Sequence, residues 1–340
     1  MTGPELRQDP VTGRWVILAP ERARRPREFR PAEDGLERSA PCPFCEGHED
    51  RTPPEVLARR GPGSRPDGPG WRVRVVPNLY PAVVPGGAGA APEERGLFRR
   101  RDGAGAHEVI VESPRHLVSL TALDETAVAE VLDVWQERLR GLGRERGLAH
   151  ALIFKNVGAR AGASLEHVHT QLIALPAVPV VVEEELAGAR RHHDATGRCV
   201  FCEVVRAEEA DGRRLVSGTG SHVALEPWAS RFPFETHVLP RRHVARFEDL
   251  LPGERADLAR ALRDVLARLE QVLDAPHYNL LVHTAPFGQD GDAPYHWHIE
   301  ILPRLARLAG FEWGTGFHIN AVPPEEAAAR LRGGRFKVES

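Results

Sequence analysis

Apolar residues recur at intervals of three and four in two segments of the chain, which is the spacing of one face of an α-helix. Thr121 is a candidate cap for the first helix. The apolar face of that helix comprises Val128, Val131, Leu132, Trp135 and Leu139. The second segment carries Leu258, Leu262, Val265, Leu266 and Leu269 in the same way. The pattern therefore predicts two amphipathic helices, each with one face in a core.

Short runs rich in β-forming residues accompany the two helices. Residues 13–20 and 236–240 are predicted strands, and each helix is followed by a further run, at 151–155 and 278–282. Pro- and Gly-rich residues 61–70 and 85–96 are predicted loops. Because one order of elements occurs twice, we expect an α+β protein of two tandem half-domains, residues 1–180 and 181–340. Each half is predicted to hold a small antiparallel sheet with a packed helix.

Composition narrows the class of protein. A chain of 340 residues with 41% hydrophobic content exceeds the usual size of a single core, which suits two fused halves. The net charge of −3 supplies no basic field for nucleic acid or an anionic membrane. No apolar run reaches the length of a membrane span, and the polar N-terminus does not resemble a secretory signal. We expect a cytoplasmic protein that binds neither membranes nor nucleic acid.

The chain contains two copies of one pattern of potential metal ligands. Each copy has a Cys-x-x-Cys pair, a histidine shortly after a proline, and a His-x-His, with similar spacing between the last two parts. The predicted ligands are Cys42, Cys45, His116 and His167 in the first copy, and Cys199, Cys202, His243 and His296 in the second. Such sets complete a Cys2His2 tetrahedron, so we expect two zinc ions per chain. Redox pairs and buried small hydrophobes are the alternatives for the cysteines.

The two copies differ around the second histidine of each His-x-His. Residues two apart on a strand face the same side, so His169 lies beside the ligand His167 while Val168 points into the core. The loop at 156–164 consists of small residues whose N–H groups, hydroxyl and amide suit phosphate oxygens, and Gln171 follows. In the second copy the loop carries Asp290 and Asp292, and the anion Glu300 follows. We therefore expect the first half to be catalytic and the second to be structural.

A neutral imidazole is a competent nucleophile toward phosphorus, because its unperturbed pKa of about 6.5 leaves it largely unprotonated near pH 7. Attack by His169 on the α-phosphorus of a nucleotide would give a nucleotidyl-histidine. A lone histidine is more often a satisfied core residue. The neighbouring metal ligand and phosphate-suited loop favour the catalytic interpretation for His169.

The residues from Asn156 to Gln171 carry a Gly-Ala-Ser-x-x-His-x-His-x-Gln motif. Together with Arg14-Trp15-Val16 and Arg22-x-x-Arg25-Pro26, this motif resembles the galactose-1-phosphate uridylyltransferase family, the transferase branch of the histidine-triad superfamily. The resemblance covers nearly the whole chain and implies tandem histidine-triad-like halves, a homodimer and no cofactor besides metal. It further implies roles for individual residues: His169 as nucleophile, Gln171 at the phosphates in catalysis, and Arg22, Arg25, Asn78, Asn156, Gly162 and Ser164 in substrate binding.

Several positions depart from the family pattern. Val168 and Thr170 stand where some members have proline and glycine, and Leu79 where some have an acidic residue. The second Cys-x-x-Cys takes the place of an iron site that other members build from a glutamate and three histidines. Residues 310–320 resemble related nucleotide-sugar phosphorylases, which make ADP by transfer to phosphate.

The resulting prediction is transfer of UMP between UDP-glucose and galactose 1-phosphate, in galactose metabolism. The alternative in the same class is phosphorolysis of ADP-glucose. An alternative of another class is a binding module built on two zinc knuckles, which predicts clustered basic and aromatic residues, whereas the arginines here are interspersed with acids. A hydrolase is disfavoured because Gln171 stands where the hydrolytic branch carries a third histidine.

Overall fold

The computed structural model describes residues 3–24, 41–86, 93–289, 291 and 293–333. Arg25, Asp290 and Asp292, which carried sequence-based expectations, lie outside these residues. The described helices are α1 (Glu125–Leu142), α2 (Val180–Thr196), α3 (Val200–Asp211), α4 (Pro252–Leu273), α5 (Gly310–Thr315) and α6 (Pro324–Leu331).

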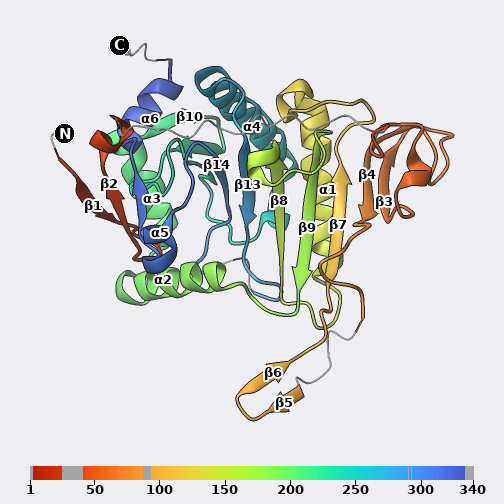
Figure 1. Cartoon of the computed structure of the whole chain (residues 1–340), viewed down its shortest axis with the longest axis horizontal. Coiled ribbons are helices and arrows are strands. Elements are labelled where there is room, and N and C mark those ends of the chain that lie inside the picture. The colour runs from red at the N-terminus through yellow and green to blue at the C-terminus, as the bar shows by residue number, and fades with distance from the viewer. Residues whose placement is uncertain (1–2, 25–40, 87–92, 290, 292, 334–340) are drawn as a thin grey trace.

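Ten strands of the described chain form one antiparallel sheet, in the order β10-β11-β12-β14-β13-β8-β9-β7-β4-β3 (Figure 1). Their bounds are β3 (Leu57–Arg60), β4 (Trp71–Pro77), β7 (Ala106–Val111), β8 (His150–Val157), β9 (His169–Leu175), β10 (Leu215–Gly218), β11 (His222–Leu225), β12 (Thr236–Pro240), β13 (Tyr278–His283) and β14 (His298–Pro303). The α+β class is confirmed. The sheets of the two halves are joined edge to edge where β13 pairs with β8.

Two smaller sheets lie outside this large one. Strands β1 (Glu5–Gln8) and β2 (Trp15–Leu18) pair with each other, and β2 pairs in parallel with β15 (His318–Asn320) near the other end of the chain. Strands β5 (Glu93–Arg95) and β6 (Phe98–Arg100) form a hairpin that projects from the body (Figure 1). The expected loop at 85–96 is therefore wrong at its end, because residues 93–95 pair with β6.

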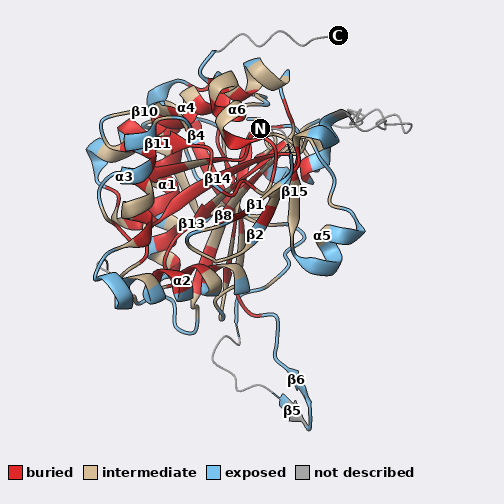
Figure 2. Cartoon of the chain, turned by 90° about the vertical axis from the view of Figure 1, so that its left-hand side faces the viewer, coloured by how far each residue is buried: buried red, intermediate tan, exposed pale blue. Residues whose placement is uncertain are grey.

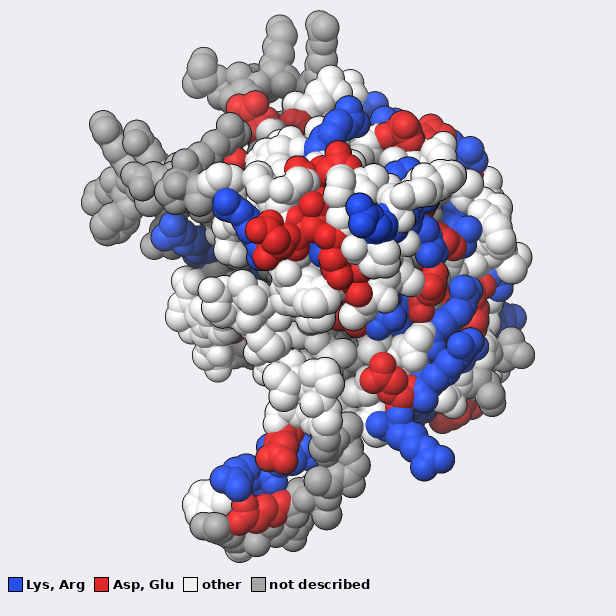
Figure 3. Space-filling view, turned by 90° about the vertical axis from the view of Figure 1, so that its right-hand side faces the viewer, with Lys and Arg blue, Asp and Glu red and all other residues white. Residues whose placement is uncertain are grey.

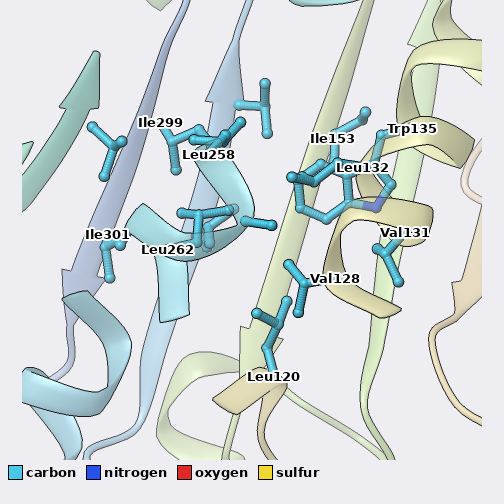
Figure 4. Close-up of a cluster of buried hydrophobic side chains, with 14 of the residues drawn as sticks. Leu120, Val128, Val131, Leu132, Trp135, Ile153, Leu258, Leu262, Ile299 and Ile301 are labelled. Atoms are coloured by element: carbon cyan, nitrogen blue, oxygen red, sulfur yellow. The ribbon is translucent and has the colours of Figure 1, made fainter. Parts of the chain in front are cut away.

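Helices α1 and α4 cover one face of the sheet and create the main core. Their apolar stripes meet Ile153 of β8 and Ile299 and Ile301 of β14, and all of these side chains are buried (Figure 4). Figure 2 shows that the residues of the large sheet are mostly buried, whereas α5 and the β5–β6 hairpin are exposed. Burial of this apolar face supplies the main driving force that holds both helices to the sheet.

The cap of α1 is not the predicted one. Thr121 lies in a short 3-10 helix, Leu120–Ala122, whose own cap is Ser119. Asp124 caps α1 instead, since its side chain accepts a hydrogen bond from Ala127 N–H at 2.8 Å. An aspartate directly before the first helical residue satisfies an N–H group that has no partner within the helix, which Thr121 is too distant to do.

Candidate active site and metal centres

The four predicted ligands of the first copy lie together. Cys45 Sγ lies 3.5 Å from His116 Nδ1 and 3.7 Å from His167 Nδ1, and Cys42 Sγ lies 3.6 Å from His167 Nδ1. In a tetrahedron with Zn–S of about 2.3 Å and Zn–N of about 2.0–2.1 Å, sulfur and nitrogen are about 3.6 Å apart. The donor set and its spacing therefore fit a tetrahedral zinc ion.

The second copy repeats this geometry. Cys199 precedes α3 and Cys202 lies in its first turn, while His243 follows β12 and His296 precedes β14. Cys202 Sγ lies 3.5 Å from His243 Nδ1 and 3.6 Å from His296 Nδ1. All eight side chains thus form two separate groups whose donor atoms lie within 4.8 Å of one another.

Backbone carbonyls orient three of the four ligand histidines. The Nε2–H groups of His167 and His296 donate to Ser113 O and Pro240 O, each at 2.8 Å, and that of His243 donates to Ala293 O at 3.1 Å. With the hydrogen on Nε2, the lone pair of Nδ1 faces the thiols, as a metal ligand requires. Burial lowers the pKa of His167 to about 4, which keeps this imidazole neutral.

His169 is the first residue of β9, and its Nε2 atom carries the lone pair of the ring. Its Nδ1–H donates to His167 O at 2.7 Å, which leaves the lone pair on Nε2. Burial lowers the pKa of this imidazole below its ordinary value, an effect to which the cation of Lys155 adds. The ring also packs against Phe44, with 5.2 Å between centroids. Because Phe44 lies between Cys42 and Cys45, the metal loop fixes one side of the candidate nucleophile.

A buried ion pair lies behind this histidine. Lys155 Nζ donates to Glu112 Oε2 at 2.5 Å and to the carbonyl of His169 at 2.8 Å, and the Thr170 hydroxyl donates to Glu112 Oε1. Sequence reasoning missed this pair. The available signal was a charged residue directly after each of two apolar runs, residues 109–111 and 151–154. Since Lys155 holds the backbone of His169, the pair fixes where the imidazole leaves the strand.

A cavity of about 220 Å³ opens beside His169. Its lining includes Lys155, Asn156, Gly158, His167 and His169. Gly158 has φ +79°, and a Cβ at this position would lie 2.2 Å from His277 Cδ2, so only glycine fits there. The loop thus brings its backbone close to the cavity, as the sequence-based expectation of a phosphate site requires.

Gln171 and Asn78 meet at a third residue, His107, which sequence reasoning also missed. Ala82 N–H donates to His107 Nδ1 at 3.0 Å, so the ring hydrogen is on Nε2 and donates to Gln171 Oε1 at 2.9 Å. Asn78 Nδ2 lies 3.1 Å from the same Nε2. Because both nitrogens carry hydrogens in this tautomer, the two groups are in contact without a hydrogen bond between them. With its oxygen occupied, Gln171 presents its NH2 group as a donor.

The remaining predicted substrate residues lie further from the cavity. Of the described part of the chain, Gly162, Ser164, Asn78, Gln171 and Arg22 are not among its lining residues. Gly162 and Ser164 are exposed on the loop between β8 and β9, and Arg22 is exposed on the 3-10 helix Pro20–Arg24. The structure therefore brings Asn156, His167 and His169 to one cavity and leaves the others around it.

The second half contains a group of buried acids and histidines that the sequence did not reveal. Glu185, His283, His298 and Glu300 have donor atoms within 4.8 Å of one another. This group of two glutamates and two histidines is distinct from the second Cys2His2 set, and it is not the set of one glutamate and three histidines that the second Cys-x-x-Cys was expected to replace. The residues are far apart along the chain, and only the pairing of β13 with β14 unites three of them.

Internal partners already balance the charges of this group. His283 Nδ1 lies 2.9 Å from Glu185, which with Glu300 raises the pKa of His283 to about 9. Arg231 donates to Glu300 Oε2 at 2.7 Å. His298 Nε2 faces two carboxylates, at 3.9 Å from Glu185 and 4.0 Å from Glu300. A cavity of about 500 Å³ adjoins this group. It is larger than the cavity at His169, and acidic residues outnumber arginines in its lining, with Glu185, Glu235 and Glu300 beside Arg231.

Basic and acidic side chains are interspersed on the face shown in Figure 3. Arg72 pairs with Glu130, and Arg59 with Asp133 and Glu137. Such neutralised arginines do not form the basic stripe that nucleic acid requires. In the described chain, no helix combines the length and apolar character needed to cross a membrane.

Comparison with known proteins identifies the family. Residues 71–179 match the N-terminal domain of galactose-1-phosphate uridyl transferase, and residues 185–332 match its C-terminal domain. The chain belongs to the galactose-1-phosphate uridylyltransferase family. It is thus an enzyme of a nucleotidyltransferase family, which confirms the resemblance and argues against a zinc-knuckle binding module.

Within this family, similarity is higher to a phosphorylase than to the transferases compared. The chain is 37% identical to ADP-glucose phosphorylase of Arabidopsis thaliana over 335 residues, covering 97% of this chain and 92% of that protein. It is 30% identical to the galactose-1-phosphate uridylyltransferase of Thermotoga maritima over 336 residues, covering 96% and 98%.

Solved structures give the same order. The crystal structure of the Arabidopsis thaliana ADP-glucose phosphorylase with bound ADP-glucose superimposes with a TM-score of 0.83 at 34% identity, covering 98% of this chain and all of that one. A uridylyltransferase structure gives 0.76 at 31% identity, covering 97% and 98%. Both comparisons give higher similarity to the phosphorylase, the alternative named in the sequence analysis, than to the uridylyltransferases compared.

Proposed function

We propose that this protein transfers AMP from ADP-glucose to inorganic phosphate through a nucleotidyl-histidine, yielding ADP and glucose 1-phosphate. The observation that carries the choice of substrate is the 37% identity to ADP-glucose phosphorylase across 97% of the chain. The free Nε2 of His169 beside a phosphate-suited cavity supports the covalent mechanism. Transfer of UMP to galactose 1-phosphate is the second candidate, supported by the match to both uridylyltransferase domains.

In the first step, the Nε2 lone pair of His169 attacks the α-phosphorus of ADP-glucose. A nitrogen–phosphorus bond forms, the bond from α-phosphorus to the bridging oxygen breaks, and glucose 1-phosphate leaves with the electron pair. In the second step a phosphate oxygen attacks the same phosphorus, the nitrogen–phosphorus bond breaks, and ADP forms. The leaving group departs as a phosphate ester, so no side chain has to protonate it.

The remaining residues bind and orient in this mechanism. Gln171, with its oxygen held by His107, donates N–H to the α-phosphate, and the backbone of the 156–164 loop receives the other phosphate oxygens. Lys155 and His167 hold the backbone and Nδ1 of the nucleophile. We further propose zinc at both Cys2His2 sites, where a closed tetrahedral ion contributes folding free energy and fixes the loops.

The division of labour follows from these roles. We propose residues 1–180 as the catalytic half and residues 181–340 as the structural half, in a homodimer. Arg22 and Arg25, near the start of the chain, and Gly162, Ser164 and Asn78 are proposed as substrate contacts on the family resemblance.

A side-by-side assay tests the substrate. ADP-glucose and UDP-glucose are each incubated with inorganic phosphate and with galactose 1-phosphate, and kcat/KM is measured for all four combinations. We expect ADP-glucose with phosphate to be the best pair by roughly tenfold or more, since discrimination of about 1.4 kcal/mol gives that ratio. Turnover only with UDP-glucose and galactose 1-phosphate would contradict the proposal and restore the second candidate.

A further inference from the structure

The junction between the two halves, where β13 pairs with β8, lies next to the loop at residues 156–164. Strand β13 pairs with β8 so that Asn279 of the second half stands opposite Asn156 of the first. Asn279 is buried, with 6% of its surface exposed. Its amide reaches the loop itself as well as the neighbouring strand, so it links β13 to two parts of the candidate site.

The orientation of the Asn279 amide is fixed by partners whose roles cannot be exchanged. Its Nδ2 donates to Ala161 O at 2.8 Å, and a carbonyl oxygen only accepts. Its Oδ1 accepts from Arg304 Nε, and a guanidinium only donates. A flipped amide would place its oxygen against the Ala161 oxygen and its NH2 against the Arg304 N–H. The assignment of oxygen and nitrogen therefore follows from the chemistry of these partners.

This orientation determines that of Asn156. The second hydrogen of Asn279 Nδ2 is donated to Asn156 Oδ1 at 2.7 Å. The NH2 group of Asn156 therefore points away from β13, on the side of Gly162, where a Cβ would lie 3.8 Å from its nitrogen. Asn156 also lines the cavity beside His169, and because its oxygen is held by Asn279, the group it has left to offer a ligand is the NH2 donor.

We propose that Asn279 is a positioning residue of the phosphate site, by which the second half sets the donor direction of Asn156 and anchors the loop at Ala161. The identity of the ligand, a nucleoside diphosphate, rests on the proposed function. The second half thus contributes to the reaction site across the strand junction, although His298 is not in that site.

Asn279→Asp is the sharpest variant, because it keeps the size of the side chain and the contact with Arg304 but removes both donated hydrogens. Asn156 is then expected to turn its NH2 toward the new carboxylate and its oxygen toward the phosphate. We expect the Kd for ADP, measured by calorimetry, to rise about tenfold or more, because the ligand then meets a carbonyl oxygen in place of an N–H donor. Asn279→Ala leaves Asn156 free to rotate, so its effect is expected to be smaller.

A double-variant cycle separates positioning from simple loss of structure. In an Asn156→Ala background, Asn279→Asp is expected to change ADP affinity by less than about twofold, because the group it orients is gone. Equal effects with and without Asn156 would overturn the proposal. So would wild-type affinity in Asn279→Asp.

Gln136→Glu is the matched control. Gln136 is also a buried amide whose NH2 donates to backbone carbonyls, including Leu250 O at 2.8 Å, and whose oxygen accepts from Arg255 at 2.7 Å, but it lies in α1 away from the cavity. Its acidic variant is expected to lower thermal stability while leaving ADP affinity unchanged.

The two proposals fail in different ways. Wild-type protein that binds ADP or UDP but turns over neither nucleotide sugar contradicts the proposed function, and the cycle, run with the nucleotide that binds, still decides the role of Asn279. Wild-type protein that binds neither nucleotide overturns both proposals.

Discussion

The two halves of this protein hold nearly identical Cys2His2 groups but surround the next histidine differently. In both, the outer histidine donates Nδ1–H to the carbonyl of the inner one, at 2.7 Å for His169 and 3.1 Å for His298. In both, the phenylalanine of the Cys-x-Phe-Cys turn packs on the outer ring, with centroids 5.2 Å apart for Phe44 and 5.3 Å for Phe201. The metal-binding frame therefore fixes the tautomer and position of the outer ring in each half.

What differs is the charge that the free nitrogen meets. His169 has the cation of Lys155 behind it and a glycine-containing loop in front, whereas Nε2 of His298 faces Glu185 and Glu300. Carboxylates 3.9 and 4.0 Å from Nε2 disfavour a phosphate at His298, whereas the cavity at His169 combines Asn156 and Gly158 with the acidic residues Glu166 and Glu270. The same backbone frame thus supports a candidate nucleophile in one half and a buried charge network in the other.

The largest predicted difference between the halves is in chemistry. His169→Ala is expected to lower kcat by roughly 10⁴-fold or more, because a covalent nucleophile has no substitute, while His298→Ala retains most activity. Each variant is incubated with nucleotide sugar labelled in the α-phosphate, without acceptor, and examined for acid-labile, base-stable label on the protein. Wild type and His298→Ala are expected to carry label. Label on a folded His169→Ala variant would refute the assignment of the nucleophile.

The metal sites sharpen the comparison. We expect close to two zinc ions per chain in wild type and one in both Cys45→Ser and Cys202→Ser, with a loss of several kcal/mol of stability in each. Only Cys45→Ser is expected to lower the kcat of the folded fraction, because His167 orients His169. Metal analysis, thermal unfolding and turnover are measured on the same samples. One zinc or none in carefully prepared wild type would contradict two sites.

The smallest expected effect is a pH dependence confined to the second half. The pKa of His283 is raised to about 9 and that of Glu185 is lowered to about 2, each chiefly by the other against the cost of burial. The histidine contribution to stability is full below its ordinary 6.5 and is lost as pH rises through about 9. The glutamate contribution is full above its ordinary 4.5 and is lost as pH falls toward about 2.

The stabilisation from this pair is therefore expected to be greatest between about pH 4.5 and 6.5. His283→Gln should reduce stability by roughly 2–3 kcal/mol in that window, counting the shared interaction once, and by much less above pH 9. Urea unfolding of wild type and variant at several pH values measures the difference. A difference that does not change with pH would show that His283 is not charged in the folded protein.

The sequence was sufficient for features that depend on residue type at short range. Helical spacing predicted α1 and α4, and the duplicated pattern of Cys-x-x-Cys and His-x-His predicted both ligand groups, which the structure assembles. Lys155, Glu112 and His107 were missed because their importance lies in hydrogen bonds between strands whose pairing the sequence does not state. The group around Glu185 was missed for the same reason, since α2 reaches β13 only in the folded chain. Likewise, no periodicity shows that β8 and β13 join two sheets into one.

That joined sheet has a consequence for symmetry. Two identical subunits that paired through β8 and β13 would form a two-fold dimer, and any substitution in one site would appear in both. In one chain the pairing is kept by the covalent connection, while each site is encoded separately. One copy can then hold carboxylates where the other holds the 156–164 loop, and a side chain such as Asn279 can contact the loop of the opposite half. Joining the two copies in one chain therefore allows the two halves to carry different residues at equivalent positions.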